Sequence, residues 1–260
     1  MVRTEAKYTI EDLLEIMKRL RDECPWDAKQ THHTLKQYLL EEAYEVLETI
    51  DLESWDELSS ELGDLLLQII FHSEIASRAG EFDFSDVVDG IADKLVHRHP
   101  HVFADTRVNS AEEVQDNWEH SKLLKENRKS ILSGIPKSAP ALLQAQRLQQ
   151  KAATVGFDWT EMNPVIDKID EEWQEFKQAL KDNDQMEMKK EFGDLLFSMV
   201  NLARYCKIVS EDALRLTNQK FIRRFQYIEK QYDNNPKLMK KQSLDSLDQY
   251  WNDAKNLEND

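Results

Sequence analysis

Hydrophobic residues recur at three- and four-residue spacing along most of the chain. The pattern is clearest over residues 9–21, 35–50 and 58–75, where leucine and isoleucine mark one side of each segment. This spacing is typical of an α-helix that buries one face, whereas a half-buried strand alternates at every second residue. Strand-like alternation is absent over any useful length, so the sequence predicts an all-α fold.

Two polar residues stand where helices are expected to begin. Thr9 precedes the first segment and is followed by Asp12, and Ser85 follows the break at Gly80. A threonine or serine side chain in this position accepts a hydrogen bond from a free N–H group of the first helical turn. We therefore expect Thr9 and Ser85 to cap the helices that follow them.

An internal repeat divides the chain into two halves. An acidic block E-E-x-x-E and a second block E-x-G-D each occur twice, and the second copy follows the first at a constant offset of 130 residues. Residues 133–140, SGIPKSAP, form the clearest cluster of helix breakers and lie near the middle of the chain. The sequence thus predicts a tandem repeat of two helical-bundle domains, residues 1–130 and 141–260, joined by a linker at 131–140.

The repeated blocks place carboxylates on the faces of neighbouring helices. Residues three apart on a helix project from the same side, and residues 181–184 form a plausible turn between two antiparallel helices. Four carboxylates are then expected to converge in each half. They are Glu172, Glu175, Glu191 and Asp194 in the second half, and Glu42, Glu45, Glu61 and Asp64 in the first.

A solvated acidic face is the ordinary alternative to a metal site. The acidic blocks adjoin strongly apolar stretches, and partly buried carboxylates that repel one another are costly unless a cation compensates. An all-oxygen ligand set without histidine or cysteine indicates Mg²⁺, with Mn²⁺ possible, and a di-iron bundle would need Glu-x-x-His. Such a site without a nucleophilic cysteine or Ser–His set favours phosphate ester or anhydride chemistry.

Composition narrows the classes of partner. The chain has 260 residues, a formal net charge of −16 and six dispersed glycines that form neither a Rossmann fingerprint nor a P-loop. The negative charge argues against long nucleic acid and anionic membranes as partners. We expect a cytoplasmic protein, because its two cysteines lie far apart and its sequence shows neither an apolar leader nor an apolar run long enough to span a bilayer.

The acidic blocks resemble the E-E-x-x-E and E-x-x-D motifs of the MazG superfamily, the all-α nucleoside triphosphate pyrophosphohydrolases. Four further stretches, 24–31, 98–105, 155–159 and 200–204, are similar to its two-domain bacterial members. The resemblance covers almost the whole chain. It implies that the chain hydrolyses NTPs and dNTPs, ATP among them, to the monophosphate and pyrophosphate with the help of Mg²⁺. It also implies a helical homodimer with a house-cleaning or stress role.

We expect the second half to carry the principal site. Lys168, Lys189 and Lys190 correspond there to Tyr38, Ser59 and Ser60 of the first half, and a triphosphate needs cations beyond the metal. On this hypothesis the quartet Glu172, Glu175, Glu191 and Asp194 binds the metal, and Glu171 orients or deprotonates the attacking water. Lys168, Lys189, Lys190, Lys220 and Arg224 neutralise phosphate charge, and Trp251 stacks on the base.

Several alternatives stay open at this point. Lys220 and Arg224 also fit an ordinary basic stripe, and Trp251 an ordinary core residue. The first half is either a second, narrower hydrolytic site or a degenerate one that serves regulation and dimerisation. The whole chain is alternatively a dUTP/dCTP or phosphoribosyl-ATP pyrophosphatase, or a non-enzymatic acidic interaction module. His97, His99 and His101 form either a metal tract or, as we favour, a loop at Pro100.

Overall fold

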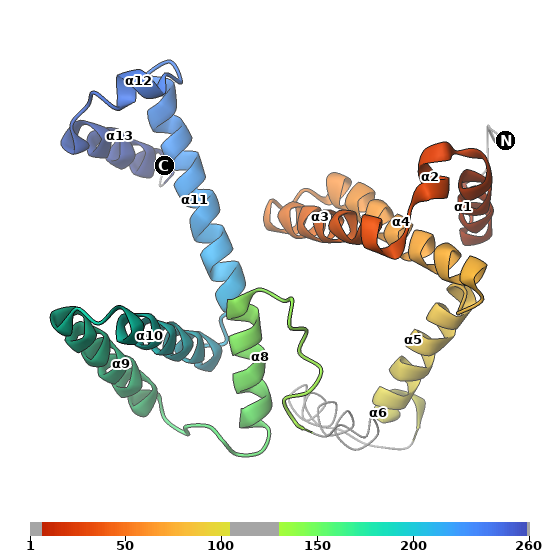
Figure 1. Cartoon of the computed structure of the whole chain (residues 1–260), viewed down its shortest axis with the longest axis horizontal. Coiled ribbons are helices and arrows are strands. Elements are labelled where there is room, and N and C mark those ends of the chain that lie inside the picture. Colours follow the sequence, from red (N-terminus) through yellow and green to blue (C-terminus); the bar gives the residue numbers. More distant parts are fainter. Residues whose placement is uncertain (1–6, 105–129, 259–260) are drawn as a thin grey trace. The chain divides into compact units, whose positions relative to one another are not determined.

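The structure, a computed structural model, describes residues 7–104 and 130–258, and every regular element among them is a helix (Figure 1). The chain divides into two compact units, Met1–Asn109 and Ser110–Asp260. The prediction of an all-α fold with a tandem helical repeat is confirmed. None of the described helices is both long enough and apolar enough to cross a membrane.

The first unit is built around a long helical hairpin. α3 and α4 pack against each other, and α1 packs on α4. Its helices are α1 (Ile10–Glu23), α2 (Pro25–Lys29), α3 (His32–Asp51), α4 (Trp55–Ala79), α5 (Phe84–Arg98) and α6 (Pro100–Phe103). Apolar side chains from three of these helices meet in a small core formed by Met17, Leu35, Ile70 and Phe71.

The helix starts in the first unit follow capping chemistry. Thr9 caps α1 as predicted, and its side chain exchanges hydrogen bonds with Asp12. The prediction for Ser85 is wrong, because Asp83 caps α5 and accepts hydrogen bonds from the backbone of Ser85 and Asp86. A carboxylate two residues upstream is the stronger acceptor, so the helix begins earlier than expected.

The histidine tract lies where one helix ends and the next begins. α5 ends at Arg98, and Pro100 opens the short helix α6. The Nδ1 atoms of His97 and His99 lie 2.7 Å and 2.6 Å from the carbonyl oxygens of Asp93 and Leu95. Pro100 therefore opens a short helix where the sequence favoured a loop. Among the described residues the tract joins none of the groups able to hold a metal.

The second unit repeats the helical hairpin. Its helices are α8 (Ala141–Ala153), α9 (Met162–Asp182), α10 (Gln185–Tyr205), α11 (Ser210–Gln231), α12 (Pro236–Met239) and α13 (Leu244–Leu257). The turn predicted between α9 and α10 is present: Asn183 adopts the left-handed conformation with φ 52° and Asp184 caps α10. α8 packs on α10, and α11 packs on α13.

The position of the domain boundary stays a prediction. The division between the units falls between Asn109 and Ser110, outside the described residues. The segment 131–140, expected to be a linker, falls within the second unit, where Leu132 helps to line a cavity.

Candidate metal centre and adjoining cavity

Helices α9 and α10 bring three predicted carboxylates together. Glu172 and Glu175 lie one turn apart on α9, and Glu191 comes from the first half of α10. One carboxylate oxygen from each lies within 4.8 Å of the others. Glu172 is buried, Glu191 is half-buried and Glu175 is exposed, so the cluster is accessible from solvent at Glu175.

The charged form of Glu191 is disfavoured by its surroundings. Burial raises the pKa of Glu191 above its usual value, and repulsion from Glu175 and Asp194 raises it further. A carboxyl group whose charged form is disfavoured in this way gains most from a bound cation. The donor set is all oxygen, which suits Mg²⁺ or Mn²⁺.

A lysine lies against the buried member of the cluster. Lys168 Nζ is 2.8 Å from Glu172 and 3.0 Å from Glu171. Its hydrogen bonds to Glu172 and Glu171 raise the pKa of Lys168 above its usual value, so its ammonium group stays charged. The predicted catalytic Glu171 is itself exposed and faces Lys168.

The first unit contains the corresponding trio on α3 and α4. Oxygens of Glu42, Glu45 and Glu61 also lie within 4.8 Å of one another. Burial raises the pKa of Glu42 above its usual value, with repulsion from Asp64 and Glu45 adding to the effect. In the described part of the chain no lysine or arginine pairs with this trio, and Tyr38 stands where the second unit has Lys168.

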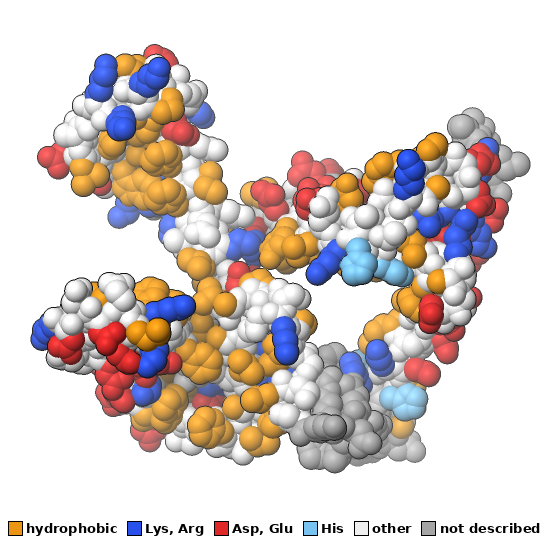
Figure 2. All heavy atoms as spheres, viewed as in Figure 1, with side chains coloured by type: hydrophobic (Ala, Val, Ile, Leu, Met, Phe, Trp, Pro, Cys, Tyr) orange, Lys and Arg blue, Asp and Glu red, His pale blue; other side chains and the backbone are white. Residues whose placement is uncertain are grey.

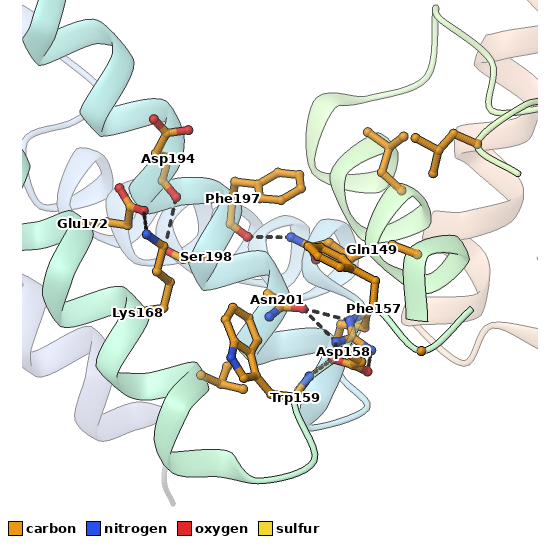
Figure 3. A pocket seen from close by; sticks show the side chains of 16 residues that line it. Gln149, Phe157, Asp158, Trp159, Lys168, Glu172, Asp194, Phe197, Ser198 and Asn201 are labelled. Atoms are coloured by element: carbon orange, nitrogen blue, oxygen red, sulfur yellow. Dashed lines mark hydrogen bonds and ion pairs between the residues drawn. The ribbon is translucent and has the colours of Figure 1, made fainter. Parts of the chain in front are cut away.

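A cavity of about 680 Å³ adjoins the second cluster. Lys168, Glu172 and Asp194 line it on one side in Figure 3, and Phe157, Asp158 and Trp159 line it on the other. Asp194 therefore faces the same space as Glu172, although it lies outside the tight trio of oxygens. Volumes of this size are typical of small-ligand sites.

Lys189 and Lys190 are exposed on the first half of α10. Lys190 Nζ lies 2.5 Å from Glu187. Neither lysine lines the cavity.

Three other predicted residues gather between α11 and α13. The Arg224 guanidinium lies 5.4 Å from the centre of the Trp251 ring and donates a hydrogen bond of 2.8 Å to Glu258. The hydrogen bond from Arg224 holds the pKa of Glu258 below its usual value, and the charges of Arg224, Arg223 and Lys220 add to the effect. Arg224 and Trp251 are thus brought into contact, and the charge of Lys220 acts on the same Glu258, but none of the three lines the cavity.

Several residues that line the cavity are not among those predicted from the sequence. Gln149 and Asn201 are both buried there, and Asp158 forms a bidentate ion pair with Arg204. The signal was present in the stretches 155–159 and 200–204. A buried asparagine within an apolar run requires hydrogen-bond partners, which is a reason to suspect a site.

The family comparison agrees with this geometry. The MazG nucleotide pyrophosphohydrolase domain matches residues 30–103 and 162–228, and these two segments contain the two acidic clusters. The family predicted from the motifs is confirmed.

Relatives match along nearly the whole chain. The nucleoside triphosphate pyrophosphohydrolase of Escherichia coli (strain K12) is 45% identical over 96% of this chain and 98% of its own length. The nucleoside triphosphate pyrophosphohydrolase/pyrophosphatase MazG of Thermotoga maritima is 42% identical over 96% and 97%. A crystal structure of a mazG-related protein from Thermotoga maritima is 31% identical, with a TM-score of 0.39, over 44% of this chain and 98% of that one. The chain belongs to the MazG nucleotide pyrophosphohydrolase family and carries its domain twice.

Proposed function

We propose that the acidic cluster of α9 and α10 is the principal site at which this chain hydrolyses nucleoside triphosphates to monophosphate and pyrophosphate. Nucleoside triphosphate pyrophosphohydrolysis is the activity of the family and of its near full-length relatives. We propose which residues carry out the hydrolysis, which cation they hold and which products they form.

The convergence of three carboxylates beside a cavity large enough for a nucleotide carries the proposal. Glu172, Glu175, Glu191 and Asp194 would hold Mg²⁺, or Mn²⁺ in its place. Bound Mg²⁺ supplies positive charge to the phosphate oxygens and makes water a better nucleophile. The disfavoured charge of Glu191 supports this assignment, because a cation relieves the repulsion among these groups.

The protein's own groups complete the reaction. Glu171 is exposed at the edge of the cluster, where it can orient or deprotonate the attacking water. Lys168 lines the cavity and offsets negative charge that develops on the leaving pyrophosphate. Lys189, Lys190, Lys220 and Arg224 stay candidates for the outer phosphates, and Trp251 for the base.

The first unit is the weaker candidate for general hydrolysis. Oxygens of its trio also lie within 4.8 Å of one another, but it lacks a lysine equivalent to Lys168. We propose that it is either a narrower hydrolytic site or a regulatory one. Disabling each cluster separately distinguishes these roles.

We also propose that the chain forms a homodimer in the cytoplasm. Large apolar side chains on α11 and α13 are exposed, among them Phe221, Ile222 and Leu244. Figure 2 shows hydrophobic side chains gathered over the lobe that contains α13. A second copy of the chain would cover such a surface. Sedimentation equilibrium at micromolar concentration should give twice the monomer mass, and a monomer mass would contradict the proposal.

Product analysis tests the proposed reaction. The full chain is incubated with each of the eight common NTPs and dNTPs, with Mg²⁺ and with EDTA, and the products are separated by ion-exchange chromatography. We expect monophosphate and pyrophosphate in equal amounts from several substrates, and no turnover in EDTA. Activity confined to dUTP or dCTP would favour a narrower enzyme. No turnover combined with no Mg²⁺-dependent rise in melting temperature would favour an acidic interaction module.

A further inference from the structure

We propose that the cavity beside the second acidic cluster binds the nucleobase of the substrate, and that Asn201 and Gln149 recognise its hydrogen-bonding edge. The inference rests on the proposed function, because it takes the triphosphate to lie at Glu172 and Asp194, which line the same cavity. It gives a role to two buried amides that the hydrolytic reaction does not use.

The amide of Asn201 is held in one orientation. Its Oδ1 accepts hydrogen bonds from Nε and Nη2 of Arg204 at 3.0 Å and 2.8 Å. A guanidinium group only donates, so the oxygen of the amide must face it and the Nδ2 group must point elsewhere. Arg204 is itself fixed by two hydrogen bonds to the carboxylate of Asp158. Asn201 Nδ2 donates to no other described residue and stays available as a donor.

Gln149 supplies the complementary group. Its Nε2 donates to the carbonyl oxygen of Phe197 at 2.8 Å, which again fixes the amide orientation by chemistry. Its Oε1 is buried and has no hydrogen-bond partner in the described structure. Leaving an acceptor buried without a partner is costly, and a ligand N–H group at this position would remove the cost. Figure 3 shows both amides beside the cavity with these hydrogen bonds as dashed lines.

The walls of the cavity suit a flat ring. Phe157, Trp159 and Phe197 contribute aromatic residues, and Phe157 is 82% exposed, so its ring is accessible for stacking. Bases stack on aromatic side chains whatever their sequence identity, and enzymes read a base through its Watson–Crick edge. One fixed donor and one fixed acceptor complement such an edge, which always offers both kinds of group.

The first unit lacks this arrangement. Phe71 stands at the offset of 130 residues from Asn201, and its side chain is buried in the apolar core with Met17 and Leu35. A phenyl ring offers no hydrogen-bond donor. The base-reading pair is therefore a property of the second unit, as is Lys168.

Binding of a reaction product tests the inference separately from hydrolysis. AMP and UMP are titrated calorimetrically into the full chain in EDTA, where the acidic cluster holds no cation. We expect at least about tenfold weaker binding for Asn201→Leu and for Gln149→Met, because each removes one polar contact with the base. Asn201→Asp keeps the hydrogen bonds from Arg204 and the side-chain shape but replaces the donor with an acceptor, so it guards against loss of folding.

Gln146→Met is the matched control. Gln146 is buried on the same helix, bonds to Ile208 and Ser210, and lies outside the cavity. The Gln146→Met variant should bind AMP and UMP with the affinity of the wild type. Unchanged affinity in all Asn201 and Gln149 variants overturns the inference, as does a loss of binding confined to Trp251→Ala, which would place the base between α11 and α13. Failure of the proposed hydrolytic role appears in the pyrophosphate assay and leaves this binding result unaffected.

Discussion

Lys168 Nζ lies 2.8 Å from a carboxylate oxygen of Glu172. Among the described residues Glu172 is the one charged side chain that is buried. Burying a carboxylate is costly unless a partner compensates its charge. The ion pair therefore lets the buried Glu172 carboxylate serve as a metal ligand beside the cavity. It also keeps the ammonium group of Lys168 on the wall of that cavity, where a phosphate would bind.

Replacing this lysine tests its contribution to catalysis. We expect Lys168→Met to lower kcat/KM for ATP about 10- to 100-fold, because phosphate loses a charged partner and Glu172 loses its neutralising group. Steady-state pyrophosphate release measures the effect. Lys177→Met is the control, since Lys177 lies on the same helix over the Trp173 ring. Equal rates in both variants would remove Lys168 from the mechanism.

The raised pKa of Glu191 predicts how stability depends on pH without a cation. Its folded-state pKa lies above the usual value of 4.5, so the stability this group contributes is present below pH 4.5 and is lost as pH rises through the folded pKa. In EDTA at pH 7, Glu191→Gln should therefore raise the melting temperature relative to the wild type. It should also shrink the rise that Mg²⁺ produces in the wild type.

Scanning calorimetry with EDTA or Mg²⁺ at pH 5 and 7 measures both effects. Glu187→Gln is the control, because Glu187 pairs with Lys190 outside the acidic trio. A melting temperature that falls equally in both variants would show that Glu191 is not strained by its neighbours.

The ion pairs of Arg78 in the first unit predict a dependence of stability on pH opposite in sign to that of Glu191. It donates hydrogen bonds to Asp22 and Glu74 at 2.7 Å and holds the pKa of Asp22 below its usual value. The stability this pairing gives Asp22 is present above pH 3.8 and is lost as pH falls through the lower folded pKa. Arg78→Ala should thus lower the melting temperature at pH 7, with a smaller deficit near pH 3.

The exposed ion pair between Arg19 and Glu23 provides the comparison. Both side chains are more than 60% exposed, so Arg19→Ala should change the free energy of unfolding by less than about 0.5 kcal/mol. Urea unfolding of both variants at each pH makes the measurement. An Arg78→Ala deficit that does not change with pH would contradict the link to Asp22.

Local patterns predicted the helices better than their exact starts. The segment predicted at 58–75 is α4, which extends over Trp55–Ala79 until Gly80 takes a left-handed conformation. At α5 the sequence pattern favoured Ser85 as the cap, whereas Asp83 caps the helix two residues earlier. Hydrophobic period identifies a buried face, whereas the first turn depends on which side chain reaches the free N–H groups.

The acidic trios were predictable because residues one helical turn apart share a face, and a repeated spacing pairs two such faces. The cavity was not predictable in the same way. Gln149 on α8 and Asn201 on α10 come to line one cavity through tertiary packing, and their amide orientations depend on Phe197 and Arg204. No spacing rule along one helix contains that information.

Pyrophosphate release by two double variants determines which acidic cluster carries the hydrolysis. One combines Glu172→Gln with Asp194→Asn, and the other combines Glu42→Gln with Asp64→Asn, each measured with ATP and Mg²⁺ after its helical content is checked by circular dichroism. We expect the first double variant to lose at least about 99% of the wild-type rate, because the principal site can no longer hold its cation. The second should retain most of that rate. Undiminished turnover in the first variant, with loss in the second, would contradict the account and move the activity to the first domain.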